Sequence, residues 1–179
     1  MSKQFSFITS TDMCEPFEAV VGMAVYREDR VEWVKQAINS VLNQTYQSLV
    51  YVIVIDGEIN EDIYTYLCDV CRQNKKMMLV RNRSNSGLSV CMNFIVDWTL
   101  SEYSDTKYFF RMDADDISEK DRFASQINYL DKHQNVSILG CALKEIDENG
   151  LIVGKRKLPV KHGDIIKFLP KRCSINHPT

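Results

Sequence analysis

Four apolar runs, each followed by a segment of helical periodicity, constrain the fold of this chain more than any other feature. The runs, each typical of a strand buried on both faces, are residues 19–26, 49–55, 77–80 and 107–112. The helical segments are residues 31–42, with Asp29 as expected N-cap, 61–74, 88–98 and 119–133. Strands that alternate with helices form a mainly parallel sheet with helices on both faces. We therefore predict a doubly wound, Rossmann-related α/β domain.

Two flanking stretches do not follow this alternation. Residues 1–18 show no clear period, so we expect a loose leader. After the last helix, an apolar strand over residues 136–146, a turn at 147–150 and a return strand from Leu151 predict a hairpin that adds a mixed or antiparallel edge to the sheet. The chain stops at Thr179 without a closing element, which suggests that it is shortened.

Charge is close to balanced overall but uneven along the chain. A net charge of −2 gives no general affinity for nucleic acid. Residues 155–179 differ, because they hold seven Lys or Arg and one acid, Asp164, for a net of +6. Such a segment can meet phosphates, an anionic acceptor or a membrane surface, and a solvated basic face explains it equally well.

Targeting signals and cysteine usage indicate a reducing compartment. The first thirteen residues lack the charged-then-apolar order of a signal peptide, and no apolar run is long enough to cross a bilayer. We expect a cytoplasmic protein, peripheral to the membrane at most, whose six cysteines stay reduced. Cys68 and Cys71 form a C-x-x-C inside a helical pattern without a second pair, so we interpret them as core thiols rather than zinc ligands.

The apolar run at residues 108–112 ends abruptly in three carboxylates, Asp113, Asp115 and Asp116. In open α/β sheets, ligands bind outside the carboxyl ends of the strands, where these side chains would lie. Such dense like charge is costly unless a cation or hydrogen-bond donors offset it, and Mg²⁺ and Mn²⁺ prefer hard oxygen ligands. The sequence therefore favours a divalent metal site. The alternative is that one acid caps the following helix and the others are solvated.

Polar groups at three predicted strand ends could line one crevice suited to a nucleotide. Asp56 can accept a hydrogen bond from a base or a ribose hydroxyl, and a metal on Asp115 can bridge diphosphate oxygens. The arginines available to a diphosphate are Arg81, Arg83 and Arg111. No glycine-rich phosphate loop occurs, so the metal and side chains would hold the phosphates.

An ordered set of motifs resembles the family 2 glycosyltransferases, which are inverting nucleotide-sugar enzymes with the GT-A fold. The motifs are Val20–Glu28, Ser40–Tyr46, Val52–Gly57, Asn85–Ser89 with Asn93, Arg111–Asp116, Arg122–Phe123 and Asn176–Thr179. The acidic D-x-D alone is a weak signal, whereas the ordered set is specific. The resemblance implies a GT-A-like nucleotide-sugar-binding domain over residues 19–179.

The resemblance also implies roles for individual residues. Asp56 resembles the aspartate that reads the base, Asp113 the first acid of the D-x-D near the ribose and metal, and Asp115 the acid that ligates Mn²⁺ or Mg²⁺. The other donor-binding residues are Tyr26, Glu28, Arg83 and Asn85 by resemblance, and Arg111 by the chemistry above. Two departures bear on base selectivity: Arg27 stands where the family often has Asn, and Gly57-Glu58 follows Asp56 in place of a second acid.

The implied reaction moves a sugar from a nucleotide-diphosphate sugar, foremost a UDP-sugar, to a hydroxyl of a glycan or lipid-linked acceptor, with inversion and metal assistance. Family members carry the catalytic base in an acceptor-binding half that nothing here matches. We therefore expect the base beyond Thr179 and a fragment that binds donor without being active alone. The alternatives are a sugar-nucleotide nucleotidyltransferase, whose glycine-rich loop is missing after the first strand, and a non-catalytic nucleotide-binding domain.

Overall fold

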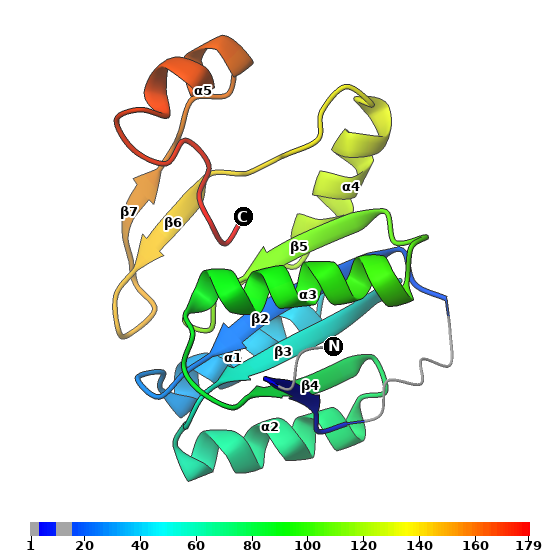
Figure 1. Cartoon of the computed structure of the whole chain (residues 1–179). Coiled ribbons are helices and arrows are strands. Elements are labelled where there is room, and N and C mark those ends of the chain that lie inside the picture. Colours follow the sequence, from blue (N-terminus) through cyan, green and yellow to red (C-terminus); the bar gives the residue numbers. More distant parts are fainter. Residues whose placement is uncertain (1–3, 10–15) are drawn as a thin grey trace. The chain divides into compact units, whose positions relative to one another are not determined.

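The computed structural model describes residues 4–9 and 16–179, in two compact units that divide after Ile127 (Figure 1). The first unit contains β1 (Phe5–Phe7), β2 (Ala19–Val25), α1 (Val31–Leu42), β3 (Leu49–Asp56), α2 (Glu61–Gln73), β4 (Met77–Asn82), α3 (Leu88–Glu102) and β5 (Tyr108–Met112). Helix α4 (Arg122–Lys132) runs across the division, and the second unit contains β6 (Leu143–Ile146), β7 (Ile152–Arg156) and α5 (His162–Phe168). In the described part of the chain, no helix has both the length and the apolar character needed to cross a bilayer.

One five-stranded sheet, in the order β1-β4-β3-β2-β5, organises the first unit. Strands β2 to β5 are parallel, as predicted, and β1 pairs antiparallel with β4. The chain places β3 and then β4 on one side of β2 and returns to place β5 on the other. The strand order therefore reverses between β2 and β5, and such switch points are where open α/β sheets bind ligands.

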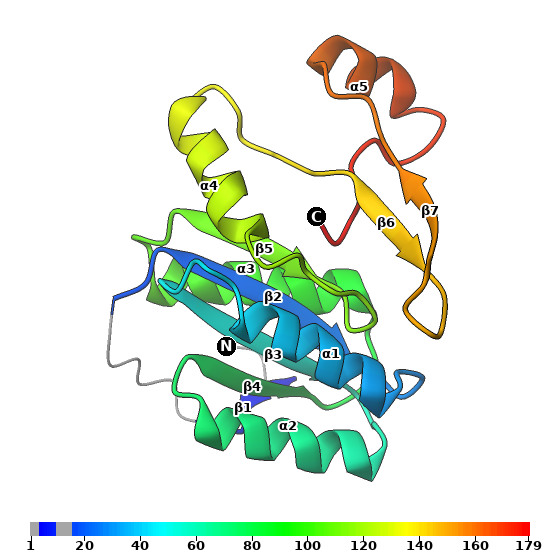
Figure 2. The same cartoon turned by 180° about the vertical axis from the view of Figure 1, so that it is seen from behind.

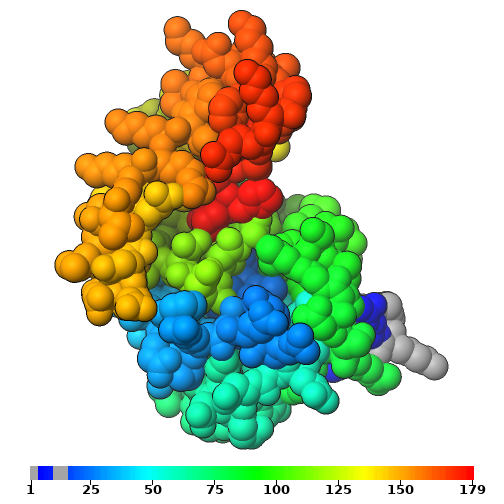
Figure 3. Space-filling view, turned by 90° about the vertical axis from the view of Figure 1, so that its left-hand side faces the viewer, coloured from blue at the N-terminus to red at the C-terminus, as the bar shows by residue number. Residues whose placement is uncertain are grey.

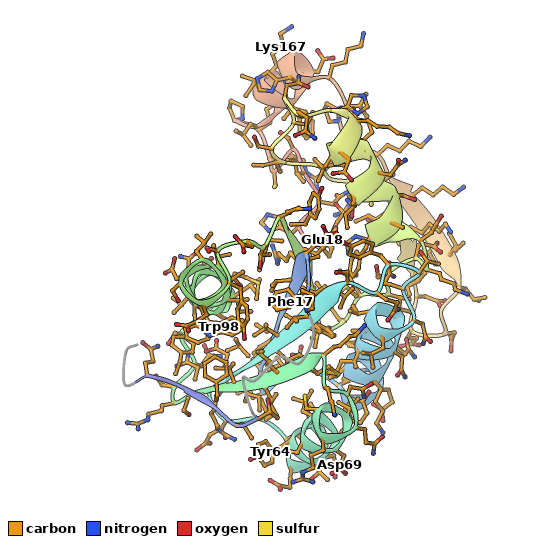
Figure 4. All side chains as sticks on the ribbon, turned by 90° about the vertical axis from the view of Figure 1, so that its right-hand side faces the viewer. Phe17, Glu18, Tyr64, Asp69, Trp98 and Lys167 are labelled. Carbon is orange, nitrogen blue, oxygen red and sulfur yellow. The ribbon has the colours of Figure 1, made fainter. Side chains whose placement is uncertain are left out.

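Helices cover both faces of this sheet, which confirms the prediction from the apolar runs. Every residue of β3 is buried, and successive side chains point to opposite faces. Val50, Val52 and Val54 pack in the apolar cluster that includes α3. Tyr51 and Ile53 pack in the cluster formed with α1, α2 and the start of α4. Figures 1 and 2 show α3 on one face and α1 and α2 on the other, and Figure 4 shows the same layers with α3 nearly end-on.

The predicted C-terminal hairpin forms, but it does not extend the main sheet. Strands β6 and β7 pair antiparallel as a separate two-stranded sheet, with Gly150 in the connecting turn at a φ of 79°. The strand predicted over residues 136–146 is wrong over most of its length, because β6 begins at Leu143. Residues 136–142 have no paired neighbour, and Ile138 is 73% exposed. An apolar run does not form a strand without a partner for its backbone N–H and C=O groups.

The antiparallel edge of the main sheet comes from the segment that the sequence predicts to be a loose leader. Residues Phe5–Phe7 form β1, and this part of the prediction is wrong. The reason is packing, because Phe5 stacks on Phe94 of α3 at 4.0 Å between ring centroids and Phe7 contacts Trp98 at 5.4 Å. Two aromatic side chains at alternate positions thus bury one face of a three-residue strand. Residues 1–3 and 10–15 of the predicted leader lie outside the described residues.

Candidate functional site

The carboxyl ends of β2, β3 and β5 lie at one edge of the sheet. Strands β2 and β5 pair in register as far as Met23 and Met112, and Val25 of β2 pairs with Ile55 of β3. The polar residues that follow these strands therefore leave the sheet side by side, at the switch point. Figure 3 shows the residues after β5, in yellow-green, next to the blue surface of residues that follow β2.

Five carboxylates, here called the acidic cluster, gather at this point: Glu28, Asp29, Asp113, Asp115 and Asp116. Burial is the main cause that raises the pKa of Asp29 to about 6, and the charges of Asp115, Asp113 and Glu28 act in the same direction. Burial also raises the pKa of Asp116 to about 6, again with contributions from Asp115 and Asp113. Because each carboxylate disfavours the ionisation of its neighbours, a bound cation would stabilise the cluster.

Asp113 and Asp115 differ in their protein partners. The guanidinium of Arg111 donates to Oδ1 of Asp113 at 2.7 Å, and these side chains are only 20% and 25% exposed. Asp115 is exposed, and its carboxylate makes no hydrogen bond or ion pair with the residues that the structure describes. Asp113 is thus held in place by a cation of the protein, whereas Asp115 is open to a ligand.

The acidic cluster fits a metal ion whose coordination is completed by a ligand. Among residues 4–9 and 16–179, no three His, Cys, Asp or Glu side chains are already grouped around a metal position. Mg²⁺ seldom needs such a cage, because it keeps several waters and binds through one or two carboxylates together with substrate phosphates. Asp113 and Asp115, in one turn after β5, supply carboxylates of that number and kind.

Gln44, just after α1, fixes the loop that carries the acids. Its side chain is 2% exposed. The amide group donates to Oγ of Ser118 at 3.2 Å and to the carbonyl oxygen of Glu119 at 2.7 Å. Its Oε1 accepts from the backbone N–H of Phe123 at 3.1 Å, at the start of α4. Gln44 therefore links the end of α1, the helix after β2, to the loop after β5 that carries the acids.

Replacing this side chain will destabilise the protein. Gln44→Ala leaves the buried Phe123 N–H without its acceptor and removes one of the donors to the Glu119 carbonyl, which also accepts from the Arg122 N–H at 3.0 Å. An unsatisfied buried group costs about 1–3 kcal/mol. We expect a loss of about 2–3 kcal/mol and a fall in melting temperature of about 5–10 °C by calorimetry. Gln47→Ala is the control, because Gln47 is exposed and donates locally to the Gln44 carbonyl. Equal falls in both variants would show that the loop contacts of Gln44 contribute nothing.

Asp56, at the end of β3, organises the loop of residues 83–87 between β4 and α3, here called the donor loop after the role that the resemblance implies for Arg83 and Asn85. Asp56 is 3% exposed. Oδ1 accepts from the N–H of Ser86 at 2.9 Å and from the side-chain amide of Asn82 at 2.7 Å, and Oδ2 accepts from the N–H of Gly87 at 2.8 Å. Gly87 is the N-cap residue of α3 and has no side chain to cap it, so Asp56 supplies the acceptor and the negative charge at this helix terminus.

Two residues that the sequence analysis names as donor-binding, Arg83 and Asn85, lie in the donor loop. Arg83 and Asn85 are exposed, and the Asn85 side-chain amide donates to the backbone carbonyl of Asp56 at 3.4 Å. Gly57 has a φ of 86°, and a Cβ there would lie 2.7 Å from the Asn85 nitrogen, so glycine permits the close approach. Tyr26, 41% exposed, and Glu28, whose side chain is 64% exposed, follow β2, which pairs with β3, the strand that ends at Asp56.

Sequence reasoning missed or misplaced two residues of the site. Asp29 was expected to cap α1, but Arg30 is the N-cap residue and makes no side-chain capping bond. The Asp29 carboxylate instead accepts from the N–H of Tyr26 at 2.9 Å and belongs to the acidic cluster. Gln44 stands in a motif of the resemblance, but a glutamine at a helix end carries no local sign of burial. Its role depends on contacts with residues more than seventy positions away.

The raised pKa values predict an unusual dependence of stability on pH. An aspartate that titrates near 6 in the folded protein and near its ordinary value of 3.8 when unfolded keeps its proton longer in the folded state. Below about pH 4, the raised pKa values of Asp29 and Asp116 therefore do not reduce the stability of the folded protein. As pH rises from about 4 to about 6, they progressively lower the free energy of unfolding. Asp29→Asn with Asp116→Asn will remove this decline in denaturant titrations at pH 4.5 and 7. An unchanged decline in the double variant would show that other groups cause it.

Sequence comparison finds relatives among glycosyltransferases. A sequence model of the family described as Glycosyl transferase family 2 matches residues 20–179. An uncharacterized glycosyltransferase of Haemophilus influenzae is 31% identical over 158 residues, which are 88% of this chain and 57% of that protein. The O-antigen biosynthesis glycosyltransferase WbnJ of Escherichia coli is 31% identical over 163 residues, 88% of this chain and 58% of that protein. The chain thus spans somewhat more than half the length of these relatives.

Solved structures with the same fold are also glycosyltransferases. Residues 1–349 of TarS from S. aureus, in complex with UDP-GlcNAc, have a TM-score of 0.56 and 18% identity over 80% of this chain and 37% of that one. The mannosyltransferase PcManGT from Pyrobaculum calidifontis, in complex with GDP-Man and Mn²⁺, has a TM-score of 0.52 and 12% identity over 80% of this chain and 39% of that one. The fold is that of the GT-A glycosyltransferases, as the resemblance implied, and the nucleotidyltransferase alternative is not favoured. The chain belongs to glycosyltransferase family 2, a family of sugar-transferring enzymes.

Proposed function

We propose that this chain binds a nucleotide-diphosphate sugar, foremost a UDP-sugar, together with Mn²⁺ or Mg²⁺ at the switch point between β2 and β5. One observation carries the proposal: Asp115 is exposed, without a protein partner among the described residues, inside a cluster of carboxylates that a cation would stabilise. Solved structures of the same fold in complex with UDP-GlcNAc, and with GDP-Man and Mn²⁺, support the choice of ligands.

Each candidate residue has a role that its surroundings permit. Asp115 ligates the metal ion, and Asp113, held by Arg111, contributes its second oxygen to the metal or to the ribose. Tyr26 and Glu28 line the nucleoside side of the site, together with the exposed side chains of the donor loop, Arg83 and Asn85. Bound Mn²⁺ or Mg²⁺ would neutralise charge on the departing diphosphate.

For Asp56 we propose a different role from the one that the resemblance implies. Both of its carboxylate oxygens accept hydrogen bonds from the protein, so a base would have to displace one of these donors to reach it. We propose that Asp56 shapes the donor loop and acts on the nucleotide through it. Arg83 and Asn85 then make the direct contacts from this side of the site.

The reaction proposed for the intact enzyme is displacement at the anomeric carbon with inversion. A general base removes the proton of the acceptor hydroxyl as the nucleotide diphosphate departs, and such assistance is typically worth about 10²–10⁴-fold in rate. No residue described here is assigned as that base. We propose that residues 1–179 bind donor and transfer no sugar alone. Sugar transfer by this chain to a glycan or lipid-linked acceptor would show that the base lies within it.

Calorimetric titration tests the proposed function directly. UDP, GDP and CDP are each titrated into the protein with and without Mn²⁺. We expect UDP to bind with an affinity that rises at least about tenfold in the presence of the metal, since the metal bridges phosphate and carboxylate oxygens. Equal affinities for UDP, GDP and CDP would show that the site has no preference for one base. No binding of any nucleotide would favour the non-catalytic alternative.

The second unit contains a basic segment that could bind an anionic acceptor or a membrane surface. Residues 155–179 carry a net charge of +6, and apolar side chains such as Val153 and Val160, 67% and 91% exposed, lie beside them in the sequence. Each basic residue near an anionic membrane surface contributes about 1 kcal/mol to binding. We propose peripheral association with the cytoplasmic face of a membrane, in keeping with the free thiols of the cysteines that the structure describes.

Vesicle co-sedimentation measures this association. We expect binding to vesicles that contain phosphatidylglycerol, little binding to pure phosphatidylcholine, and loss of binding in about 0.5 M salt, because screening weakens surface charge interactions. Lys155→Glu with Lys157→Glu will reduce the bound fraction. Lys35→Glu with Lys75→Glu, which makes the same change of charge in the first unit, will not. Equal effects of the two pairs would assign the binding to total charge rather than to this segment.

A further inference from the structure

The N-terminal strand β1 contacts the donor loop, although it precedes the residues that match the family. The family match begins at residue 20, and β1 covers Phe5–Phe7. Strand β1 pairs with β4 up to Asn82, the last residue before the donor loop. The segment is therefore not a mere extension of the sheet edge, because it ends beside residues proposed to contact the nucleotide.

Gln4 joins β1 to the donor loop by two hydrogen bonds. Its backbone carbonyl accepts from the N–H of Arg83 at 3.1 Å, at the beginning of the loop. Its side-chain amide donates to Oγ of Ser86 at 2.8 Å, near the end of the loop. One residue of the N-terminal segment thus contacts both ends of a five-residue loop.

The Ser86 hydroxyl is fully used by this arrangement. It accepts from the amides of Gln4 and Asn82, at 2.8 and 3.1 Å, and its proton is donated to the carbonyl oxygen of Ser84 at 3.2 Å. A serine hydroxyl has one donor and two acceptor positions, so no capacity remains. The backbone N–H of Ser86 is held at the same time by Asp56. Ser86 is therefore fixed from two sides, by the end of β3 and by the N-terminal segment.

The position of Gln4 is itself determined by packing. Phe5 stacks on Phe94 with an interplanar angle of 12°, and Phe7 packs against Trp98, so both aromatic residues of β1 rest on α3. Helix α3 begins directly after the donor loop. Strand β1 thus connects the body of this helix with the loop that precedes it, and it restricts movement of the loop relative to the helix.

We propose that β1, through Gln4, is a positioning element for the donor loop and sets the affinity of the site for a nucleoside diphosphate. Gln4 does not touch the nucleotide. It acts through Ser86 and Arg83, by reducing the number of loop conformations that binding has to select. This inference rests on the proposed function of the donor loop, and the experiment separates the two.

Two measurements on the full chain test the inference. Gln4→Ala removes the side-chain hydrogen bond and leaves the strand pairing of β1 intact. We expect a loss of UDP affinity of about three- to tenfold in the presence of Mn²⁺, which corresponds to one hydrogen bond of ordinary strength. We also expect faster hydrogen exchange at residues 83–87 in the ligand-free protein. Ser6→Ala is the matched control, because Ser6 is an exposed residue of the same strand.

Variants of Gln4 and Ser86 give results that either support or overturn the inference. Ser86→Ala should cost at least as much affinity as Gln4→Ala, because it removes the same bond together with those to Asn82 and Ser84, and the double variant should cost little more than Ser86→Ala alone. A Gln4→Ala protein that binds UDP as tightly as the wild type, or that melts lower without a change in affinity, overturns the inference. If the wild type binds no UDP, the proposed function fails, and hydrogen exchange of the ligand-free loop still decides whether Gln4 positions it: faster exchange supports this, and unchanged exchange overturns it.

Discussion

Asp115→Ala will remove the metal-dependent part of UDP binding. Asp115 is exposed, and its carboxylate has no protein partner among the described residues, so its loss takes away a ligand without breaking internal contacts. Loss of a partner that merely orients a metal ligand already lowers affinity by about 10–100-fold, and loss of the ligand itself should cost at least as much. In calorimetric titrations we expect UDP affinity to be the same with and without Mn²⁺.

The melting temperature of this variant should not fall. Removing one of five crowded carboxylates relieves repulsion, so stability in the absence of metal should be equal or higher. Asp69→Ala is the control, because Asp69, labelled in Figure 4, is exposed on α2 and pairs with Arg72, which is not part of the acidic cluster. A variant that lacks Asp115 and still shows the full effect of Mn²⁺ would contradict the assignment of Asp115 as a metal ligand.

Asp56→Ala will have the largest effect on stability. It leaves the N–H groups of Ser86 and Gly87 without their acceptor and leaves the Asn82 amide with its bond to Ser86 Oγ alone. It also removes the negative charge at the N-terminus of α3. Removing one partner from a buried, charge-assisted network costs about 3–5 kcal/mol. Denaturant titration should therefore show a loss of about 4 kcal/mol, and Asp69→Ala, which affects an exposed ion pair, less than about 1 kcal/mol.

Nucleotide selectivity separates two roles for Asp56. If Asp56 acts through the donor loop, Asp56→Asn will weaken binding of UDP, GDP and CDP by similar factors, together with a partial loss of stability. If Asp56 reads the base directly, the same change will alter the ratio of UDP to CDP affinity and leave stability largely unchanged. Calorimetry with the three nucleotides distinguishes these results.

The sequence was sufficient to predict the elements of the first unit, because their signals are local. Continuous apolar runs such as that of β3 can be buried on both faces only in a covered parallel sheet, and helical periodicity marks the segments between them. Strand β1 was not predictable in this way. Its three residues become a strand because Phe94 and Trp98, far along the chain, offer an aromatic surface.

The predicted strand over residues 136–146 failed for the converse reason. Its apolar pattern is strong, yet the residues before Leu143 have no strand neighbour, and backbone pairing decides the outcome. An apolar pattern alone therefore predicts a strand even where no neighbouring strand is available to pair with it.

The same difference between local signals and long-range contacts applies to the residues of the candidate site. The acids after β5 were found because charge density at a strand end is visible in sequence. The residues that fix the acidic loop and the donor loop were not, because Gln44 and Gln4 act through residues more than seventy positions away. Asp29 was misassigned because an acid two residues before a helix is normally read as its cap, whereas here its neighbours in space are the carboxylates after β5.

A crystal structure with UDP and Mn²⁺, with the metal located by its anomalous scattering, tests the central claim most directly. The account predicts one manganese ion bonded to the carboxylate of Asp115 and to oxygens of the diphosphate, with the nucleoside between Tyr26 and the donor loop. A manganese ion elsewhere, or UDP bound while Asp115 points into solvent without a metal, would contradict it.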